Sequence, residues 1–96
     1  MDADVSALAA RTVPRVAAKA RLEWDEVRQR HVLLYPGGLV TLNATAAEVL
    51  RLCDGERAIA QIVERLKQRY KAEHIEGEVA AFLGSLAAKG LVTYVR

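Results

Sequence analysis

The side chains that could act as nucleophiles or metal ligands are few in this 96-residue sequence and lie far apart. Cys53 is the only cysteine, and His31 and His74 are the only histidines. A structural zinc site needs about four Cys or His ligands at close spacing, so this set is too small. Cys53 also falls on the apolar stripe of an expected helix, where a thiol behaves as a small buried hydrophobe. We therefore expect no metal site and no cofactor.

The remaining candidates for catalysis or nucleotide binding lack the context that such chemistry needs. Ser85 lies in the middle of an expected helix, without the sharp strand-to-helix turn that exposes an activated serine. It also lacks the Asp-Ser-Leu context of an acyl carrier. The glycines form neither a phosphate-binding loop nor a dinucleotide fingerprint. We expect the chain not to be an enzyme.

Composition indicates one soluble domain. Hydrophobic residues make up 52%, enough for a packed core, and the net charge of +2 does not indicate nucleic-acid binding. No apolar run approaches the ~20 residues of a membrane span, and the N-terminus does not read as a secretory signal. A single cysteine suits a reducing cytosol. We expect a cytoplasmic protein with no membrane partner, with residues 14–96 in one domain after a flexible arm at 1–13.

The first half of the chain predicts a small antiparallel sheet of three strands. Apolar and acidic residues alternate over 22–25, as in a half-buried strand. Residues 31–35 are rich in β-forming types. The Pro-Gly-Gly at 36–38 supplies a turn, because proline fixes φ and glycine tolerates a positive φ. Residues 39–42 then form a short third strand.

Three amphipathic helices are expected to follow, the last ending at Gly90. Asn43 or Thr45 can cap the first, and Thr45 with Glu48 fits a reciprocal capping box. Gly55 is placed to end this helix in a left-handed conformation. The apolar positions at helical spacing are Ala46, Val49, Leu50 and Cys53 in the first helix, Ile59, Ile62, Val63, Leu66 and Tyr70 in the second, and Ile75, Val79, Phe82, Leu83 and Leu86 in the third.

With a short C-terminal strand at 91–95, the order of elements predicts an α+β, winged helix-turn-helix-like fold. In DNA-binding proteins of this type the second helix of the motif enters the major groove, and here that helix is at 75–89. It carries Glu76 and Glu78 near its start and no Arg, Asn or Gln that could read a base edge. A winged-helix DNA-binding regulator is the alternative function, and nucleic acid is not an expected partner.

A cluster of basic residues lies on the second helix and at its exit. It consists of Arg65, Lys67, Arg69 and Lys71. A solvated helix face is the default interpretation. The other is a docking surface for an acidic enzyme partner, whose attraction would weaken in salt.

The third strand is short and follows a glycine turn, which is typical of a sheet edge. An unpaired edge displays backbone donors and acceptors that can take an extended peptide as an added strand. The edge residues are Leu39, Val40, Thr41 and Leu42. If the third helix packs beside this edge, Val79, Phe82 and Leu86 line a groove for the peptide side chains. The competing interpretation places these three in the ordinary core.

Five segments combine into a more specific pattern. They are Pro14-Arg15, Leu-Glu-Trp-Asp at 22–25, His-Val-Leu-Leu-Tyr-Pro at 31–36, Leu-Asn-x-Thr-Ala-Ala-Glu at 42–48 and Leu-Arg-Leu-Cys-Asp-Gly at 50–55. Together they resemble the PqqD family of pyrroloquinoline quinone biosynthesis, over residues 14–95. Two positions depart from the family: Gly37, where members often carry Glu, and Ala58, where Ser or Thr often caps a helix. Neither position is assigned to chemistry.

The resemblance implies a winged-helix module that binds the leader region of a ribosomally made precursor peptide. Family members present the precursor, PqqA, to the radical SAM enzyme PqqE, which joins a Glu and a Tyr side chain. In related modules the peptide adds a strand beside the third strand and packs on the third helix. The matching positions here are Leu39, Val40, Thr41 and Leu42 with Val79, Phe82 and Leu86. One cysteine is too few to bind an iron–sulfur cluster. Monomer and homodimer are both compatible with the sequence.

Overall fold

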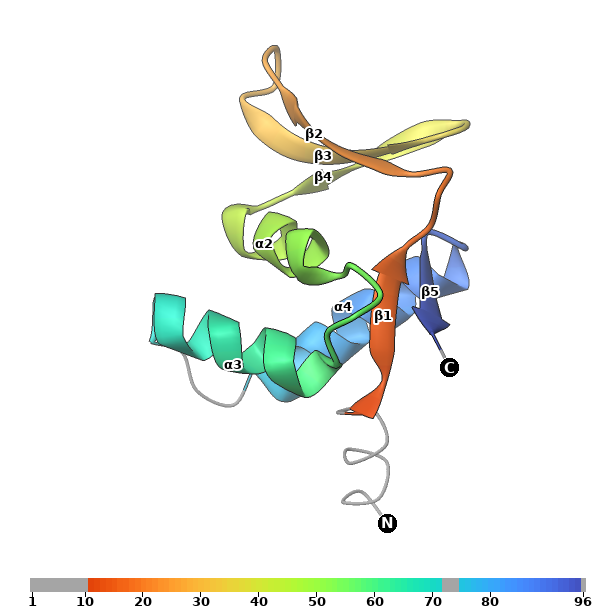
Figure 1. Ribbon diagram of the computed structural model, residues 1–96. Coiled ribbons are helices and arrows are strands. Elements are labelled where there is room, and N and C mark those ends of the chain that lie inside the picture. Colours follow the sequence, from red (N-terminus) through yellow and green to blue (C-terminus); the bar gives the residue numbers. More distant parts are fainter. Residues whose placement is uncertain (1–10, 72–74, 96) are drawn as a thin grey trace.

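The computed structural model describes residues 11–71 and 75–95, arranged as in Figure 1. The strands are β1 (Val13–Val16), β2 (Arg21–Asp25), β3 (Arg30–Tyr35), β4 (Gly38–Leu42) and β5 (Val92–Val95). The helices are α2 (Ala44–Leu52), α3 (Ile59–Tyr70) and α4 (Glu76–Ala88). The sheet of three strands, the three helices and the C-terminal strand confirm the predicted α+β order. Residues 1–10 of the expected arm and His74 lie outside the described residues.

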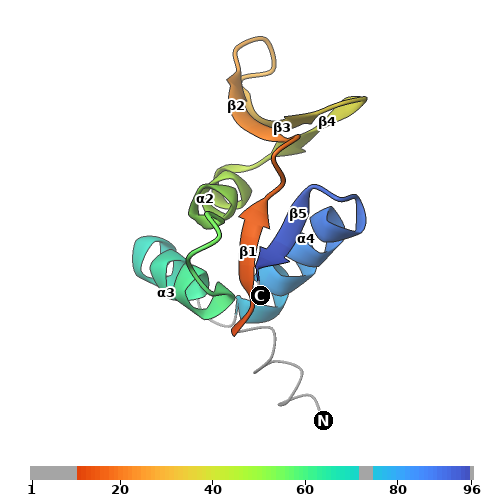
Figure 2. The same ribbon diagram turned by 45° about the vertical axis from the view of Figure 1, so that its right-hand side comes forward.

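The sequence pattern does not predict β1, which pairs antiparallel with β5 in a second sheet (Figure 2). Proline lacks an amide donor and is rare in strands, so the presence of Pro14 argues against a strand at this position. On the other side of β1, the N–H of Gly55 donates to the Pro14 carbonyl at 3.1 Å. The N–H of Ile59 donates to the Thr12 carbonyl at 2.8 Å. Residues 12–13, assigned from the sequence to the arm, are therefore bound to the domain.

The predicted sheet has the strand order β2-β3-β4, with both pairs antiparallel. Among the described residues β4 pairs only with β3, so it is an edge strand. Leu33 of β3 lies opposite Leu22 on one side and Val40 on the other. These three side chains belong to or pack against the core cluster and thus face the helices. The register therefore decides which strand residues point inward, a question that the sequence leaves open.

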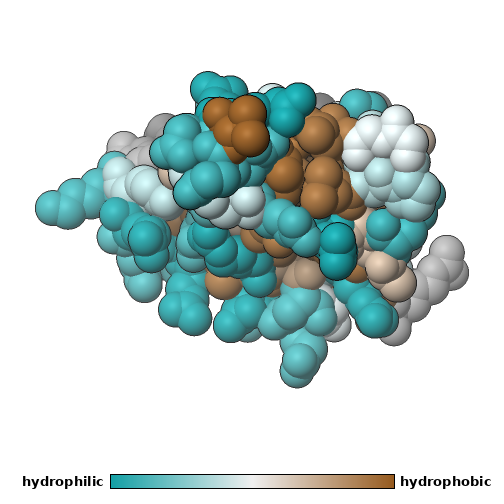
Figure 3. Space-filling view, turned by 90° about the horizontal axis from the view of Figure 1, so that it is seen from above, coloured by the Kyte–Doolittle hydropathy of each residue, from teal (hydrophilic) through white to brown (hydrophobic). Residues whose placement is uncertain are grey.

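The opposite face of this sheet is seen from above in Figure 3. Because side chains alternate along a strand, Val32, Leu34 and Leu39 point to this outer face. Apolar residues there lie among hydrophilic ones in the space-filling view. An ion pair on β2 between Arg21 and Glu23, at 3.2 Å, contributes to the hydrophilic surface of the same face.

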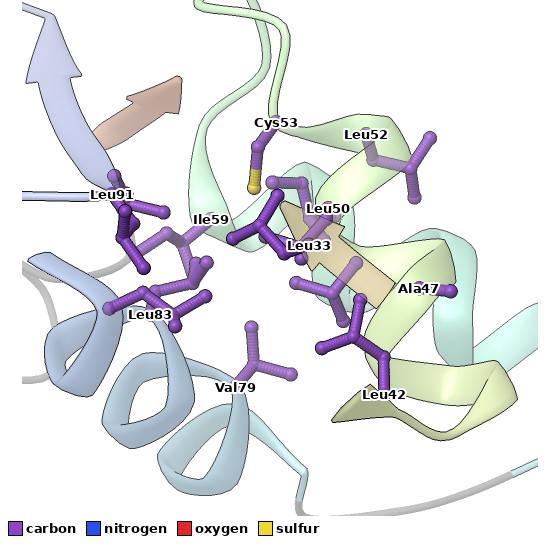
Figure 4. Packing of buried hydrophobic residues seen from close by; sticks show 14 of the residues in the cluster. Leu33, Leu42, Ala47, Leu50, Leu52, Cys53, Ile59, Val79, Leu83 and Leu91 are labelled. Atoms are coloured by element: carbon purple, nitrogen blue, oxygen red, sulfur yellow. The ribbon is translucent and has the colours of Figure 1, made fainter. Parts of the chain in front are cut away.

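The hydrophobic core lies between the inner face of the sheet and the helices (Figure 4). α2 contacts the three strands and α3, while α3 packs on α4. Leu33, Leu66 and Leu83 come from β3, α3 and α4, and each is 0% exposed. Burying such a side chain stabilises the fold by about 1.5–3 kcal/mol. The apolar stripes predicted for the helices are therefore the surfaces that join the sheet to the three helices.

Polar side chains fix where α2 and α3 begin. Asn43 caps α2, because its Oδ1 accepts from the N–H of Ala46 at 2.7 Å, so the capping box at Thr45 is not formed. α2 ends at Leu52, earlier than the predicted stop at Gly55, which adopts its positive φ of 82° in the loop that follows. At the start of α3 the Gln61 side chain accepts from the N–H of Ala58 at 2.8 Å.

Candidate functional site

The edge strand β4 offers backbone amides to a partner on its open side. Tyr35 and Gly38 face each other across a two-residue turn. Such a turn closes when its fourth N–H donates to its first carbonyl, which directs the amide of Gly38 at β3. Amide direction alternates along a strand, so the other even-numbered amides of β4 also point to β3. The amides of Leu39 and Thr41 then point away from the sheet, into the space that an added strand would occupy.

The four side chains of the predicted edge fall on two faces. Leu42 is 3% exposed and belongs to the core, and Val40 packs against the core. Leu39 is half-buried and Thr41 is exposed. The side chains of Leu42 and Val40 therefore hold β4 in place, while the backbone of Leu39 and Thr41 remains available for pairing.

A groove of about 430 Å³ opens directly after β4. Three helices form it: the first turn of α2, the end of α3 and the start of α4. Its lining is largely apolar and consists of Asn43, Thr45, Ala46, Val49, Leu66, Tyr70, Ile75, Glu78, Val79 and Phe82. A strand added to β4 would therefore run toward an apolar pocket large enough for one or two side chains.

The three residues predicted on the third helix separate in the structure. Val79 and Phe82 line the groove, and Phe82 is only half-buried. Leu86 is 2% exposed and lies in the core away from the groove, so it does not contribute to this surface. Figure 4 shows Val79 pointing from α4 toward the core cluster. Val79 therefore belongs both to the core and to the lining of the groove.

Sequence reasoning did not assign the part of the groove formed by α2 and α3. Val49 and Leu66 are buried and form its base. Tyr70 lies on the same apolar stripe as Leu66 but is 40% exposed, and its ring lines the groove. An aromatic residue at the end of a stripe, next to the helix terminus, was the signal in the sequence. Which helices meet around it depends on tertiary packing, which no local pattern reports.

The electrostatics of the groove depend on two charged residues. Glu78 is the only charged side chain that lines the groove among the described residues. Arg69 does not line the groove, but its guanidinium carbon lies 5.8 Å from the centre of the Tyr70 ring, which does. A cation over an aromatic ring is an attractive arrangement. The groove therefore has a carboxylate on the α4 side and a cation near the α3 side.

The four residues of the predicted basic cluster lie in three different settings. Arg65 and Arg69 line a second, smaller hollow of about 310 Å³ together with Glu48, Leu52 and Gln68. Lys67 instead lies 2.8 Å from the Glu76 carboxylate and joins α3 to α4. Lys71 is the residue that ends α3, with a left-handed φ of 51°. Only two of the four residues therefore share one hollow.

The structure gives Cys53 no role in chemistry. The residue is buried, and burial raises the pKa of its thiol to about 12, with a smaller contribution from the Asp54 carboxylate. A thiol with this pKa stays protonated at neutral pH and is a poor nucleophile and ligand. In the described part of the chain, no group of three or more His, Cys, Asp or Glu residues could hold a metal ion.

The charges on α4 bear on the alternative function of DNA binding. The first turn of α4, the helix that would enter a DNA groove, carries Glu76 and Glu78, and its last turn has no basic residue. Carboxylates at this end repel phosphates.

Across residues 11–71 and 75–95, no helix is both long and apolar enough to cross a bilayer.

Comparison with known proteins gives one consistent family. The family model described as coenzyme PQQ synthesis protein D (PqqD) matches residues 30–92. A protein of Methylococcus capsulatus named PqqA binding protein is 40% identical over 81 residues, covering 84% of this chain and 87% of the relative. A protein of Pseudomonas putida named PqqA binding protein 2 is 42% identical over 73 residues, covering 75% and 81%.

Solved structures share the fold. The solution NMR structure of the PqqD truncation of Methylobacterium extorquens PqqCD is described as a functional, stand-alone RiPP recognition element. It matches with a TM-score of 0.74 and 40% identity, over 84% of this chain and 88% of that chain. The heterocyclase TruD matches 88% of this chain with 12% of its own length, at a TM-score of 0.61 and 26% identity. With the family model matched over residues 30–92 and relatives at about 40% identity, this chain belongs to the PqqD family.

Proposed function

We propose that this chain is a non-catalytic recognition module that binds the precursor peptide PqqA. The observation that carries the proposal is the open edge of β4, which leads directly into the apolar groove between α2, α3 and α4. Relatives named PqqA binding proteins, and a neighbour described as a RiPP recognition element, support this choice of peptide.

In the proposed complex the peptide pairs with β4 and places an apolar side chain in the groove. The outward amides of Leu39 and Thr41 supply hydrogen bonds, each worth about 0.5–1.5 kcal/mol net. An apolar anchor buried against Val79 and Phe82 contributes about 1.5–3 kcal/mol. Ordering a flexible peptide costs several kcal/mol, so neither part alone is enough for stable binding.

We further propose that the bound peptide is presented to the radical SAM enzyme PqqE in the cytoplasm. The enzyme would then contact a surface away from β4 and the groove. The hollow lined by Arg65 and Arg69 suits this role, because it lies between α2 and α3 and combines two cations with apolar surface from Leu52. Lys67 is less suitable, since its ammonium is engaged by Glu76.

A titration of the isotope-labelled protein with synthetic PqqA, followed by backbone amide shifts, tests the binding proposal. We expect saturable changes centred on residues 39–43 and 75–82. A peptide of the same composition in scrambled order serves as the control and should produce no such changes. A flat titration with a well-dispersed spectrum, or changes confined to β5, would contradict the proposal.

A further inference from the structure

One side of the groove is formed by α4 and the residue before it. Ile75, Glu78, Val79 and Phe82 line this side. Their spacing of i, i+3, i+4 and i+7 places them on one face of a helix. Three of the four are apolar, whereas Glu78 places a carboxylate on the same face. A position on an apolar face is where a charged side chain is least expected.

Glu78 also differs from its neighbour Glu76 in its partners. The Glu76 carboxylate lies 2.8 Å from the Lys67 ammonium, which compensates its charge. Glu78 is exposed, and its side chain makes no hydrogen bond or ion pair with any described residue. Among residues 11–71 and 75–95, no cation pairs with this carboxylate at the rim of the apolar groove. A ligand that places a cation there would gain an interaction that the described residues do not supply.

We propose that Glu78 selects a peptide with Lys or Arg two positions away from its apolar anchor. The inference rests on the proposed function, because the occupant of the groove is the same peptide. In an extended peptide every second side chain points to the same side, so residues i and i+2 or i−2 face α4 together. The anchor packs on Val79 and Phe82, and the basic side chain donates a charge-assisted hydrogen bond to Glu78.

The same carboxylate discriminates against other sequences. An acidic residue at that position of the peptide would meet Glu78 as a like charge and would be repelled. An apolar residue there would leave the carboxylate without a partner and gain little. Glu78 therefore acts as a specificity residue, while Val79 and Phe82 supply affinity.

A double-mutant cycle tests this inference. The protein variants are the wild type and Glu78→Gln, which keeps the shape of the side chain and removes its charge. The ligands are synthetic PqqA and a set of peptides in which one Lys at a time is replaced by norleucine, or one Arg by citrulline. Dissociation constants are measured by calorimetry at low and at moderate salt, and each variant's free energy of unfolding is measured in urea.

We expect Glu78→Gln to weaken binding of the parent peptide by roughly three- to tenfold, the range for a partly exposed, charge-assisted contact. The loss should vanish for one neutralised peptide and persist for the others. Glu78→Lys should bind best to a peptide with Glu at that same position.

Equal affinities of wild type and Glu78→Gln, with a lower free energy of unfolding for the variant, would overturn the inference. Glu78 would then serve only to stabilise the positive end of the α4 dipole. Failure of the proposed function looks different, because the parent peptide would then not bind the wild-type protein at β4 and the groove at all.

Discussion

At the scale of single residues, Asp54 ties the loop after α2 to the start of α3. Its Oδ1 accepts from the N–H of Glu56 at 2.9 Å and of Arg57 at 3.1 Å, and its Oδ2 lies 2.7 Å from the Arg57 guanidinium. The hydrogen bond from the Glu56 amide, aided by those from Arg57, lowers the pKa of Asp54 below 3.8. Asp54 thus accepts hydrogen bonds from backbone amides of the loop, as a capping side chain does at the start of a helix.

The lowered pKa of Asp54 predicts a pH-dependent contribution to stability. A carboxyl whose folded pKa lies below its unfolded value stabilises the fold above the unfolded pKa, and this contribution is lost as pH falls through the folded pKa. We expect Asp54→Asn to be less stable than wild type at pH 7, and the difference to shrink below pH 3.8. Urea unfolding across this range checks it, with Glu56→Gln as the control. A difference that is constant with pH would contradict the prediction.

Cys53 gives a second prediction at this scale. Burial raises the pKa of its thiol from the ordinary value of 9.0 to about 12. Its contribution to stability is therefore complete below pH 9.0 and is lost as pH rises toward 12. At pH 8 we expect iodoacetamide to label the native protein at least roughly tenfold more slowly than the urea-unfolded protein, because the thiolate is the nucleophile. Mass spectrometry measures both rates, and equal rates would show that the thiol is accessible and ionised.

At the scale of elements, the amide directions in β4 predict how proline acts at the edge. Thr41→Pro removes an outward amide and leaves the ladder with β3 intact, so the fold should tolerate it. We expect peptide affinity to fall about three- to tenfold, the range for one lost hydrogen bond. Thr41→Val is the matched control, because it keeps the amide and should bind like wild type. If a correctly folded Thr41→Pro also bound like wild type, the peptide would not pair at this edge.

The second element-scale prediction concerns α3 and the enzyme partner. Arg65 and Arg69 share one hollow, whereas Lys71 lies at the end of the helix outside it. We expect Arg65→Glu with Arg69→Glu to weaken association with PqqE by roughly tenfold at low salt, and Lys71→Glu to have little effect. Affinity for the peptide should change less than about twofold in both the double variant and Lys71→Glu. Equal losses for peptide and enzyme would place these arginines in the peptide site.

Elements whose signals are local were predictable from the sequence. Alternation, the Pro-Gly-Gly turn and the helical stripes predict β2 to β4 and the three helices, because each signal lies within the element itself. β1 has no such signal, since its pairing partner is β5 near the other end of the chain and Pro14 lacks an amide. The backbone edge was therefore predictable, whereas β1 was not.

The groove was predictable only in part for the same reason. Val79 and Phe82 follow from their places on the helical stripe, but Leu86 on the same stripe lies in the core. A stripe does not say which of its members lies at an open end of the packing. Tyr70 and Glu78 line the same groove because α3 and α4 pack together, which brings the end of α3 and the start of α4 to one place.

At the scale of the whole molecule, the proposed site and the core share residues. Val79 belongs to both the core cluster and the lining of the groove, and Leu42 anchors the edge strand in the core. A peptide that binds here therefore binds only the folded chain. By linkage, such a ligand stabilises the fold by about 2.7 kcal/mol when it is present at 100 times its dissociation constant.

This linkage predicts a large thermal shift. For a domain of this size, 1 kcal/mol changes Tm by about 4–8 °C, so saturating PqqA should raise Tm by roughly 10–20 °C. Thr41→Pro, tested at the same peptide concentration, should show a shift smaller by about 3–10 °C, because its weaker affinity reduces the linkage term. Scanning calorimetry of both proteins, with scrambled peptide as control, measures this. An equal shift from scrambled peptide would mean that stabilisation comes from non-specific contact and not from strand addition at β4, since only an ordered sequence can match both the edge and the groove.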